Sequence, residues 1–155
     1  MTLGERIAEQ HRRAYQGEAW HGPAVFELLG GVSAAKAAER PIAKAHTIWE
    51  IVLHLTSWER IVRSRLVGTP LEASDAPDWP AVAATPSKKS WDAARAALHE
   101  ASEGTNVVLA RMTEKKLLST RPRTTGTYED LAHGQVQHAL YHAGQIALIK
   151  KAFRR

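Results

Sequence analysis

The sequence predicts an all-α fold, a four-helix bundle with one long crossover loop. Glycine and proline divide the chain into four long stretches in which apolar residues recur every three or four positions, the spacing of one helix face. No stretch alternates apolar and polar residues with the period of two that is typical of a half-buried strand. Proline gathers between the second and third stretches and favours a loop there, at Pro70, Pro77, Pro80 and Pro86.

The length and composition fit a single domain that spans residues 1–155. Hydrophobic residues make up 44% of the chain and charged residues 24%, which is far from the composition of disordered proteins. The N-terminal residues lack the basic and apolar segments of a secretory signal, and no apolar run approaches the length of a bilayer. We therefore expect a soluble, cytoplasmic protein without a membrane partner.

The positive charge of the chain is modest and dispersed. Lys and Arg total 21 against 16 Asp and Glu, which gives a net charge of +5. The basic residues, including Arg60, Arg63 and Arg65, are interspersed with acids, and no DNA-binding motif accompanies them. A solvated helical surface explains this pattern, so the sequence argues against a nucleic-acid partner.

The first helix is predicted to begin at Thr2, because Thr2 and Glu5 form the pattern of a capping box. It should be interrupted near Gly17. Pro23 then restarts a short apolar segment over residues 25–29, which Gly30 and Gly31 end. We expect a turn over residues 33–39.

The second long helix is predicted from Thr47, capped reciprocally by Glu50, to about Leu66. Its apolar residues cover more than one face, which is typical of a helix at the centre of a core. Residues 70–86 should form the crossover loop.

The third helix should begin at Ser87 or Ser90 and extend to Met112, with an apolar stripe suited to antiparallel packing. Residues 121–126 break the chain again. The fourth helix should begin with a Thr127–Asp130 cap and extend to the C-terminus, where basic side chains complement the helix dipole: Lys150, Lys151, Arg154 and Arg155.

The chain contains no cysteine, so any transition-metal site must use histidine and carboxylate ligands. His138 and His142 are four residues apart on the fourth predicted helix. They therefore lie about 40° apart around the helix axis and one turn apart along it, and both can reach one ion. This spacing is a weak signal by itself, because it also arises by chance.

His54 strengthens the metal hypothesis because it lies in the most apolar stretch of the chain. A buried imidazole needs a hydrogen-bond partner or a metal to offset its desolvation. If the second and fourth helices face one another, His54, His138 and His142 form a three-imidazole site with open coordination positions. A core histidine satisfied by a hydrogen bond explains His54 equally well.

Two strings carry a resemblance to a known family. They are AHTIWEIVLHL at residues 45–55 and HGQVQHALYHAGQI at residues 133–146, and the run H-x-x-Y-H-x-G-Q-I is the most specific part. With these strings the chain resembles the DinB/YfiT-like superfamily over essentially its whole length. The resemblance implies a four-helix bundle that holds a divalent metal on His54, His138 and His142, and all three positions are histidine here.

The resemblance says less about the reaction. Members of the family are described as binding nickel, zinc or manganese, and many are dimers; a site of three imidazoles also suits iron. Many are described as damage-inducible proteins or metal-dependent hydrolases, and a minority act with low-molecular-weight thiols. We therefore expect a divalent transition metal (Zn, Ni, Fe or Mn) and a homodimer, with Trp20 and Trp79 as candidates for the dimer contact.

Two hypotheses about function follow. The leading one is a metal-dependent enzyme that acts on a small molecule, as a hydrolase or a thiol transferase. The alternative is a non-catalytic metal-binding stress protein whose dimer surface is its function. The sequence assigns neither the substrate nor any catalytic residue beyond the metal ligands.

Two polar residues near the predicted ligands have competing interpretations. Glu50 could be a fourth ligand, but its place three residues after Thr47 favours a capping role. Gln145, three residues after His142, could form a hydrogen bond with a metal ligand or with a bound substrate. Packing against a neighbouring helix explains Gln145 equally well.

Three rings near the ligands are also candidates. Tyr141 could line the pocket, although a core tyrosine is the commoner case. Trp58, one turn after His54, could form an apolar wall of the metal site or simply pack in the core. His133 lies about 140° around the helix from His138, so it should not reach the same ion.

Overall fold

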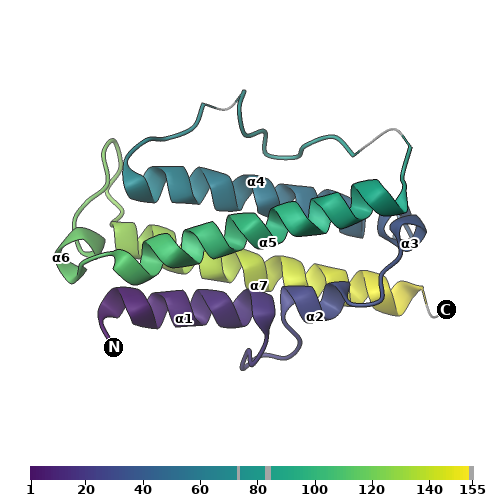
Figure 1. Ribbon diagram of the computed structural model, residues 1–155, viewed down its shortest axis with the longest axis horizontal. Coiled ribbons are helices and arrows are strands. Elements are labelled where there is room, and N and C mark those ends of the chain that lie inside the picture. The colour runs from purple at the N-terminus through teal and green to yellow at the C-terminus, as the bar shows by residue number, and fades with distance from the viewer. Residues whose placement is uncertain (73, 83–84, 154–155) are drawn as a thin grey trace.

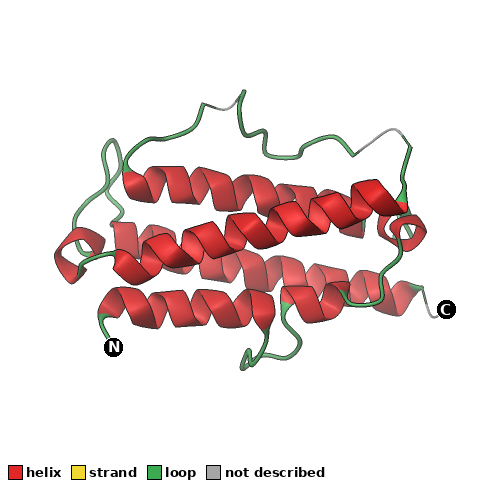
Figure 2. Cartoon of the chain, in the orientation of Figure 1, coloured by secondary structure: helices red, strands yellow, loops and turns green. Residues whose placement is uncertain are grey.

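The computed structural model describes residues 1–72, 74–82 and 85–153. Within these residues the regular structure is helical and contains no strand. Four long helices lie side by side (Figures 1 and 2). The predicted all-α four-helix bundle is confirmed, and its long helices are α1 (Leu3–Gln16), α4 (Ile48–Val67), α5 (Lys88–Arg111) and α7 (Tyr128–Ala152).

The order of the helices explains the long crossover loop. Helices α1 and α7 run in one direction, whereas α4 and α5 run in the other (Figure 1). The consecutive helices α4 and α5 are therefore parallel, and the chain between them must travel the length of the bundle. The described part of residues 69–87 does this without a helix (Figure 2). The expected antiparallel packing of the third helix holds against α1, while α5 packs in parallel against α4.

The helix starts follow the local sequence signals. In each predicted capping box the threonine side chain accepts a hydrogen bond from the backbone N–H of the acidic residue three positions later. The carboxylate of that acidic residue in turn accepts a hydrogen bond from the backbone N–H of the threonine. Ser87, rather than Ser90, is the N-cap of α5. The confirmed capping pairs are Thr2 with Glu5, Thr47 with Glu50 and Thr127 with Asp130.

Three short helices complete the fold: α2 (Val25–Leu29), α3 (Ala34–Ala38) and α6 (Glu114–Leu117). The predicted turn over residues 33–39 is a single helical turn capped by Ser33. Helix α6 was not predicted, because four residues are too few to show a helical period. At the other end of the fourth helix, Lys150 and Lys151 lie in the last turn of α7, whereas Arg154 and Arg155 lie outside the described residues.

The apolar core is divided into two clusters along the bundle. One gathers around Trp49 and Trp91, and the other around Ile7, Val62 and Leu109. All four long helices contribute residues to both clusters. Along each long helix, a buried polar residue separates the residues of one cluster from those of the other. These polar residues are His11 in α1, Glu59 in α4, Thr105 in α5 and Gln135 in α7.

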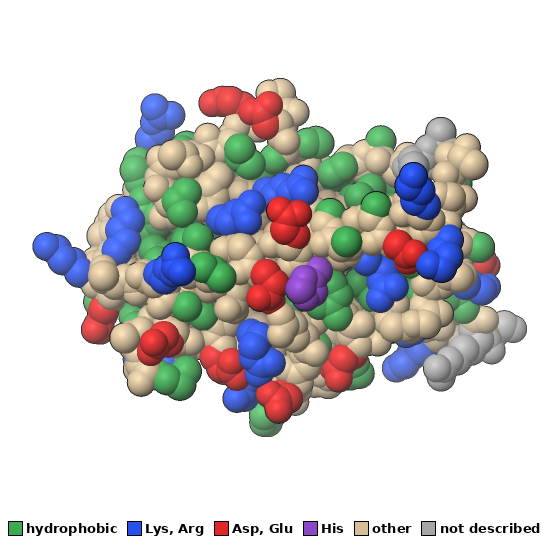
Figure 3. Space-filling model, in the orientation of Figure 1, with side chains coloured by type: hydrophobic (Ala, Val, Ile, Leu, Met, Phe, Trp, Pro, Cys, Tyr) green, Lys and Arg blue, Asp and Glu red, His purple; other side chains and the backbone are tan. Residues whose placement is uncertain are grey.

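The outer surface is mixed in charge. On the face formed by α1 and α5, the side chains of Lys and Arg are interspersed with those of Asp and Glu (Figure 3). In the described chain, no helix combines the length and the apolar character needed to cross a membrane.

Candidate metal centre

The structure brings the three predicted ligands together. His138 and His142 project from successive turns of α7 toward the buried side chain of His54 on α4. The Nε2 atom of His138 lies 3.0 Å from Nε2 of His54 and 3.1 Å from Nε2 of His142. One nitrogen from each ring lies within 4.8 Å of the other two. Two nitrogens bound to one ion at about 2.1 Å lie about 3.0–3.4 Å apart, so the spacing fits a shared ion.

Hydrogen bonds on the outer side of two rings fix where their lone pairs point. Nδ1 of His54 donates to the backbone carbonyl of Asp78 at 2.6 Å, and Nδ1 of His142 donates to Oε1 of Gln145 at 2.7 Å. With the proton on Nδ1, the Nε2 atom of each ring presents a lone pair to His138. Gln145 therefore bonds a predicted ligand, one of the two roles that the sequence left open.

His138 cannot donate a hydrogen bond to the Nε2 atoms of both His54 and His142. A proton on its Nε2 atom can point directly at only one of them, and a proton on Nδ1 leaves three lone pairs facing each other. Its Nδ1 atom has no hydrogen-bond partner among the described residues. A cation shared by the three Nε2 atoms would remove this repulsion, so the donor set fits a metal ion.

Burial keeps the three rings neutral. Desolvation, followed by the neighbouring histidines, lowers the pKa of His138 and that of His142 to about 4. Desolvation also lowers the pKa of His54, against the opposing effect of Asp78. Neutral imidazoles have free lone pairs near pH 7, as metal ligation requires.

The crossover loop covers His54. The Trp79 ring lies between the rings of His46 and His54, with centroid distances of 3.5 and 3.8 Å and interplanar angles of 9° and 8°. Trp58 Nε1 donates to Asp78 Oδ1 at 2.6 Å, which ties the same part of the loop to α4. The sequence did not identify Asp78 or Trp79 as part of the site, because both lie in an irregular segment without a periodic signal.

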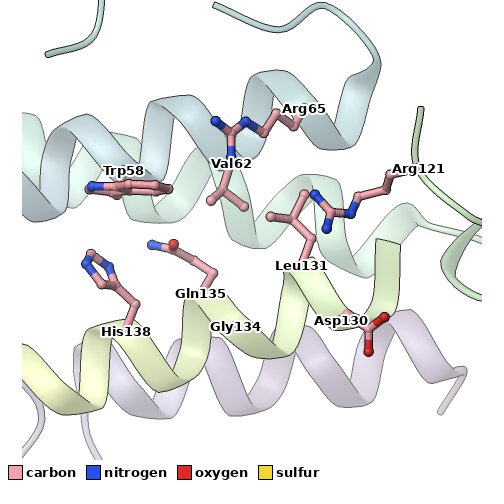
Figure 4. A pocket seen from close by; sticks show the side chains of 9 residues that line it. All are labelled: Trp58, Val62, Arg65, Arg121, Asp130, Leu131, Gly134, Gln135 and His138. Carbon is pink, nitrogen blue, oxygen red and sulfur yellow. The ribbon is translucent and has the colours of Figure 1, made fainter. Parts of the chain in front are cut away.

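A cavity of about 380 Å³ leads to His138. Trp58 and Val62 of α4 form one wall, and the residues that face them come from α7 (Figure 4). Trp58 therefore does form an apolar wall of the site, with its ring centroid 5.6 Å from that of His138. The remaining lining residues are Arg65, Arg121, Asp130, Leu131, Gly134 and Gln135.

Comparison with known proteins agrees with this fold. The family model of the DinB superfamily matches residues 19–146. The chain belongs to the DinB superfamily. Neither a curated protein nor a solved structure matches it at a significant level. Membership in the DinB superfamily, together with the three-histidine cluster, fits a metal-binding protein.

The other residues that the sequence suggested for the site, Glu50, His133 and Tyr141, do not belong to the three-histidine cluster of this DinB-superfamily chain. Glu50 acts as a cap, because its Oε2 accepts from the backbone of Thr47, and its Oε1 accepts from Arg40. His133 is half exposed and lies 3.8 Å from Glu129. The interpretation of Tyr141 as a core residue is wrong: its side chain is 65% exposed, since it faces outward from α7 beside His142.

A buried carboxylate behind the site was not anticipated from the sequence. Glu59 Oε1 accepts a hydrogen bond from Gln135 Nε2 at 2.6 Å and lies 3.0 Å from His11 Nε2. Burial raises the pKa of Glu59, but the nearby His11 and further hydrogen bonds outweigh that effect and lower it overall. Gln135 also lines the cavity at His138, so it connects this buried network to the candidate site.

Proposed function

We propose that this DinB-superfamily protein binds a divalent transition-metal ion through His54, His138 and His142 and acts with it on a small molecule. The reaction class is hydrolysis or transfer of a low-molecular-weight thiol. The observation that carries the proposal is the convergence of three Nε2 atoms whose rings are neutral and, in two cases, oriented by Asp78 and Gln145.

The donor set supports a catalytic rather than a closed site. Three neutral imidazoles suit Zn, Ni or Fe better than Ca or Mg, and the family resemblance adds Mn. Three protein ligands leave positions for water or a substrate. A bound ion would supply Lewis-acid polarisation of a substrate oxygen or sulfur and would lower the pKa of water. The chain contains no cysteine, so a thiol in the reaction would come from a second small molecule.

The residues around the histidines have separate tasks in this proposal. Asp78 and Gln145 hold the proton on Nδ1 of His54 and His142, which keeps their Nε2 lone pairs directed inward. Trp79 covers His54 from the loop side and excludes water there. The cavity beside Trp58 supplies the approach to His138, and its volume of about 380 Å³ fits a small molecule.

Elemental analysis combined with a reaction screen tests the proposal. The wild-type protein should bind about one ion per chain, and a triple variant with His54, His138 and His142 changed to Ala should bind none. His133→Ala is the matched control and should bind metal normally. Equal metal content in the triple variant would refute the site.

The reaction screen separates the enzyme from the alternative of a non-catalytic metal-binding protein. Metal-loaded protein should turn over a model ester, amide or thiol-acceptor pair, and the triple variant should not. Metal binding without turnover of any class would favour the alternative. The single domain over residues 1–155, the homodimer and the cytoplasmic location stay predictions from the sequence.

A further inference from the structure

A second cavity adjoins the one that leads to His138. Its volume is about 620 Å³, and Arg65 and Arg121 line both cavities. Arg123 adds a third guanidinium to the second cavity, and none of the described residues that line it is acidic. Its other lining residues are Gly68, Pro70, Pro122, Thr124 and Tyr128.

The three guanidinium groups are free to bind an anion. The arginine ion pairs in the described part of the chain are those of Arg12, Arg13 and Arg40, so Arg65, Arg121 and Arg123 have no carboxylate partner there. Arg121 donates from Nε to the backbone carbonyl of Thr127 at 3.0 Å, which fixes its position and leaves its terminal nitrogens available.

The carboxylate of Asp130 lines the first cavity and belongs to the N-terminal cap of α7. Oδ2 of Asp130 accepts hydrogen bonds from the backbone and the hydroxyl of Thr127 at 2.7 and 2.8 Å, as the cap of α7. Figure 4 shows the side chains of Asp130 and Leu131 pointing in opposite directions, with Arg121 on the side of Leu131. The hydrogen bonds from Thr127 and the nearby Arg121 lower the pKa of Asp130, so this side chain contributes one negative charge against the three positive charges of Arg65, Arg121 and Arg123.

We propose that Arg65, Arg121 and Arg123 bind a carboxylate or phosphate group at one end of the substrate, whose other end reaches His138. This inference rests on the proposed function and adds the substrate class to it. Guanidinium groups bind carboxylate and phosphate oxygens in pairs, with charge-assisted hydrogen bonds. Because Arg65 and Arg121 line both cavities, an anion held there lies at the entrance of the passage to His138.

The residues that line the passage between the arginines and His138 indicate the chemical character of the middle part of the substrate. Its walls include Trp58, Val62 and Leu131, so it favours an apolar or aromatic body (Figure 4). The guanidinium carbon of Arg65 lies 5.7 Å from the centroid of the Trp58 ring, which places the cation next to this apolar wall. The substrate is therefore a small elongated molecule with an anionic end, an apolar body and the reacting group at the opposite end.

Calorimetric titration of the full-length protein with inorganic phosphate and with propionate tests the anion site. Both titrations use protein as purified and protein treated with a chelator, at low ionic strength. We expect saturable binding in both forms, and the tighter anion identifies phosphate or carboxylate as the natural group. Arg65→Gln and Arg123→Gln should each weaken binding about tenfold. Arg60→Gln is the control, because Arg60 is exposed on the same helix and lines a separate cavity.

The apolar passage has its own probe. Phenylpropionate should bind more tightly than propionate, since its ring can lie against Trp58, and equal affinities would overturn the link to His138. Absence of saturable binding by either anion, or an equal loss in Arg60→Gln, would overturn the anion site and leave metal binding by the histidines intact. Arginine-dependent anion binding in a protein that takes up no metal would instead refute the proposed function and, with it, the assignment of the anion as part of a substrate.

Discussion

His54 donates a hydrogen bond of 2.6 Å from Nδ1 to the backbone carbonyl of Asp78, so a candidate metal ligand on α4 is oriented by the crossover loop. The next residue of the loop, Trp79, stacks on the same imidazole. The parallel arrangement of α4 and α5 forces this loop to run along the bundle, and the site uses it as a cover. The loop should therefore influence metal affinity as well as topology.

Trp79→Ala tests this role of the loop. The substitution removes the ring that lies between His46 and His54, and it should weaken metal binding about tenfold because partners of ligands orient them. Competition with a chelating dye measures the affinity. Trp20→Ala is the control, since Trp20 is fully exposed. Equal affinities in wild type and Trp79→Ala would show that the loop does not support the site.

Gln145→Leu should also weaken metal binding about tenfold. The amide oxygen of Gln145 accepts the Nδ1 proton of His142, and leucine cannot hold that proton in place. Gln137→Leu serves as the comparison, because Gln137 is an exposed residue of the same helix. If both variants bind metal like the wild type, the tautomer of His142 does not depend on Gln145.

The metal-free protein should lose stability as the pH falls from about 6.5 toward about 4. The pKa of His138 and that of His142 are about 4 in the folded protein and 6.5 in an unperturbed histidine. Between these pH values the unfolded chain binds protons that the folded chain excludes. The contribution of the two neutral histidines to the free energy of unfolding is therefore complete above pH 6.5 and is lost as the pH falls toward about 4. Urea unfolding at several pH values measures the slope. A double variant with His138 and His142 changed to Ala should show a smaller slope, and an unchanged slope would contradict this assignment.

Glu59→Leu should destabilise the fold by about 3 kcal/mol or more, because it leaves His11 buried without its charged partner. Urea unfolding at pH 7 measures the change. Glu129→Leu is the surface comparison and should have a small effect. A near-neutral result for Glu59→Leu would show that His11 does not depend on Glu59.

The helix starts and the three histidines could be predicted because their signals are local. A capping pair such as Thr47 and Glu50 lies within one turn, and so do His138 and His142. His54 is conspicuous because a histidine among apolar residues needs a partner. The sequence does not say which partner, since Asp78 reaches His54 only through the path of an irregular loop.

The position of Glu59 carries a local sequence signal, whereas its pairing with His11 does not. Glu59 continues the helical spacing of Leu55, Val62 and Leu66, so a carboxylate stands on the apolar stripe of α4. Its partner His11 is 48 residues away in the chain. Pairing over that distance depends on how α1 packs against the bundle, which the pattern of a single sequence does not specify.

The most direct test of the proposed metal site compares the metal content and the melting temperature of wild type, His142→Ala and His133→Ala. The caps and apolar core of the bundle do not involve the three Nε2 atoms, so His142→Ala should remain folded, with a modest shift in melting temperature, and should lose the metal. His133→Ala should match the wild type in both measurements. Retention of about one ion per chain by His142→Ala would contradict the three-histidine site, and unfolding of the metal-free protein would show that the ion is structural.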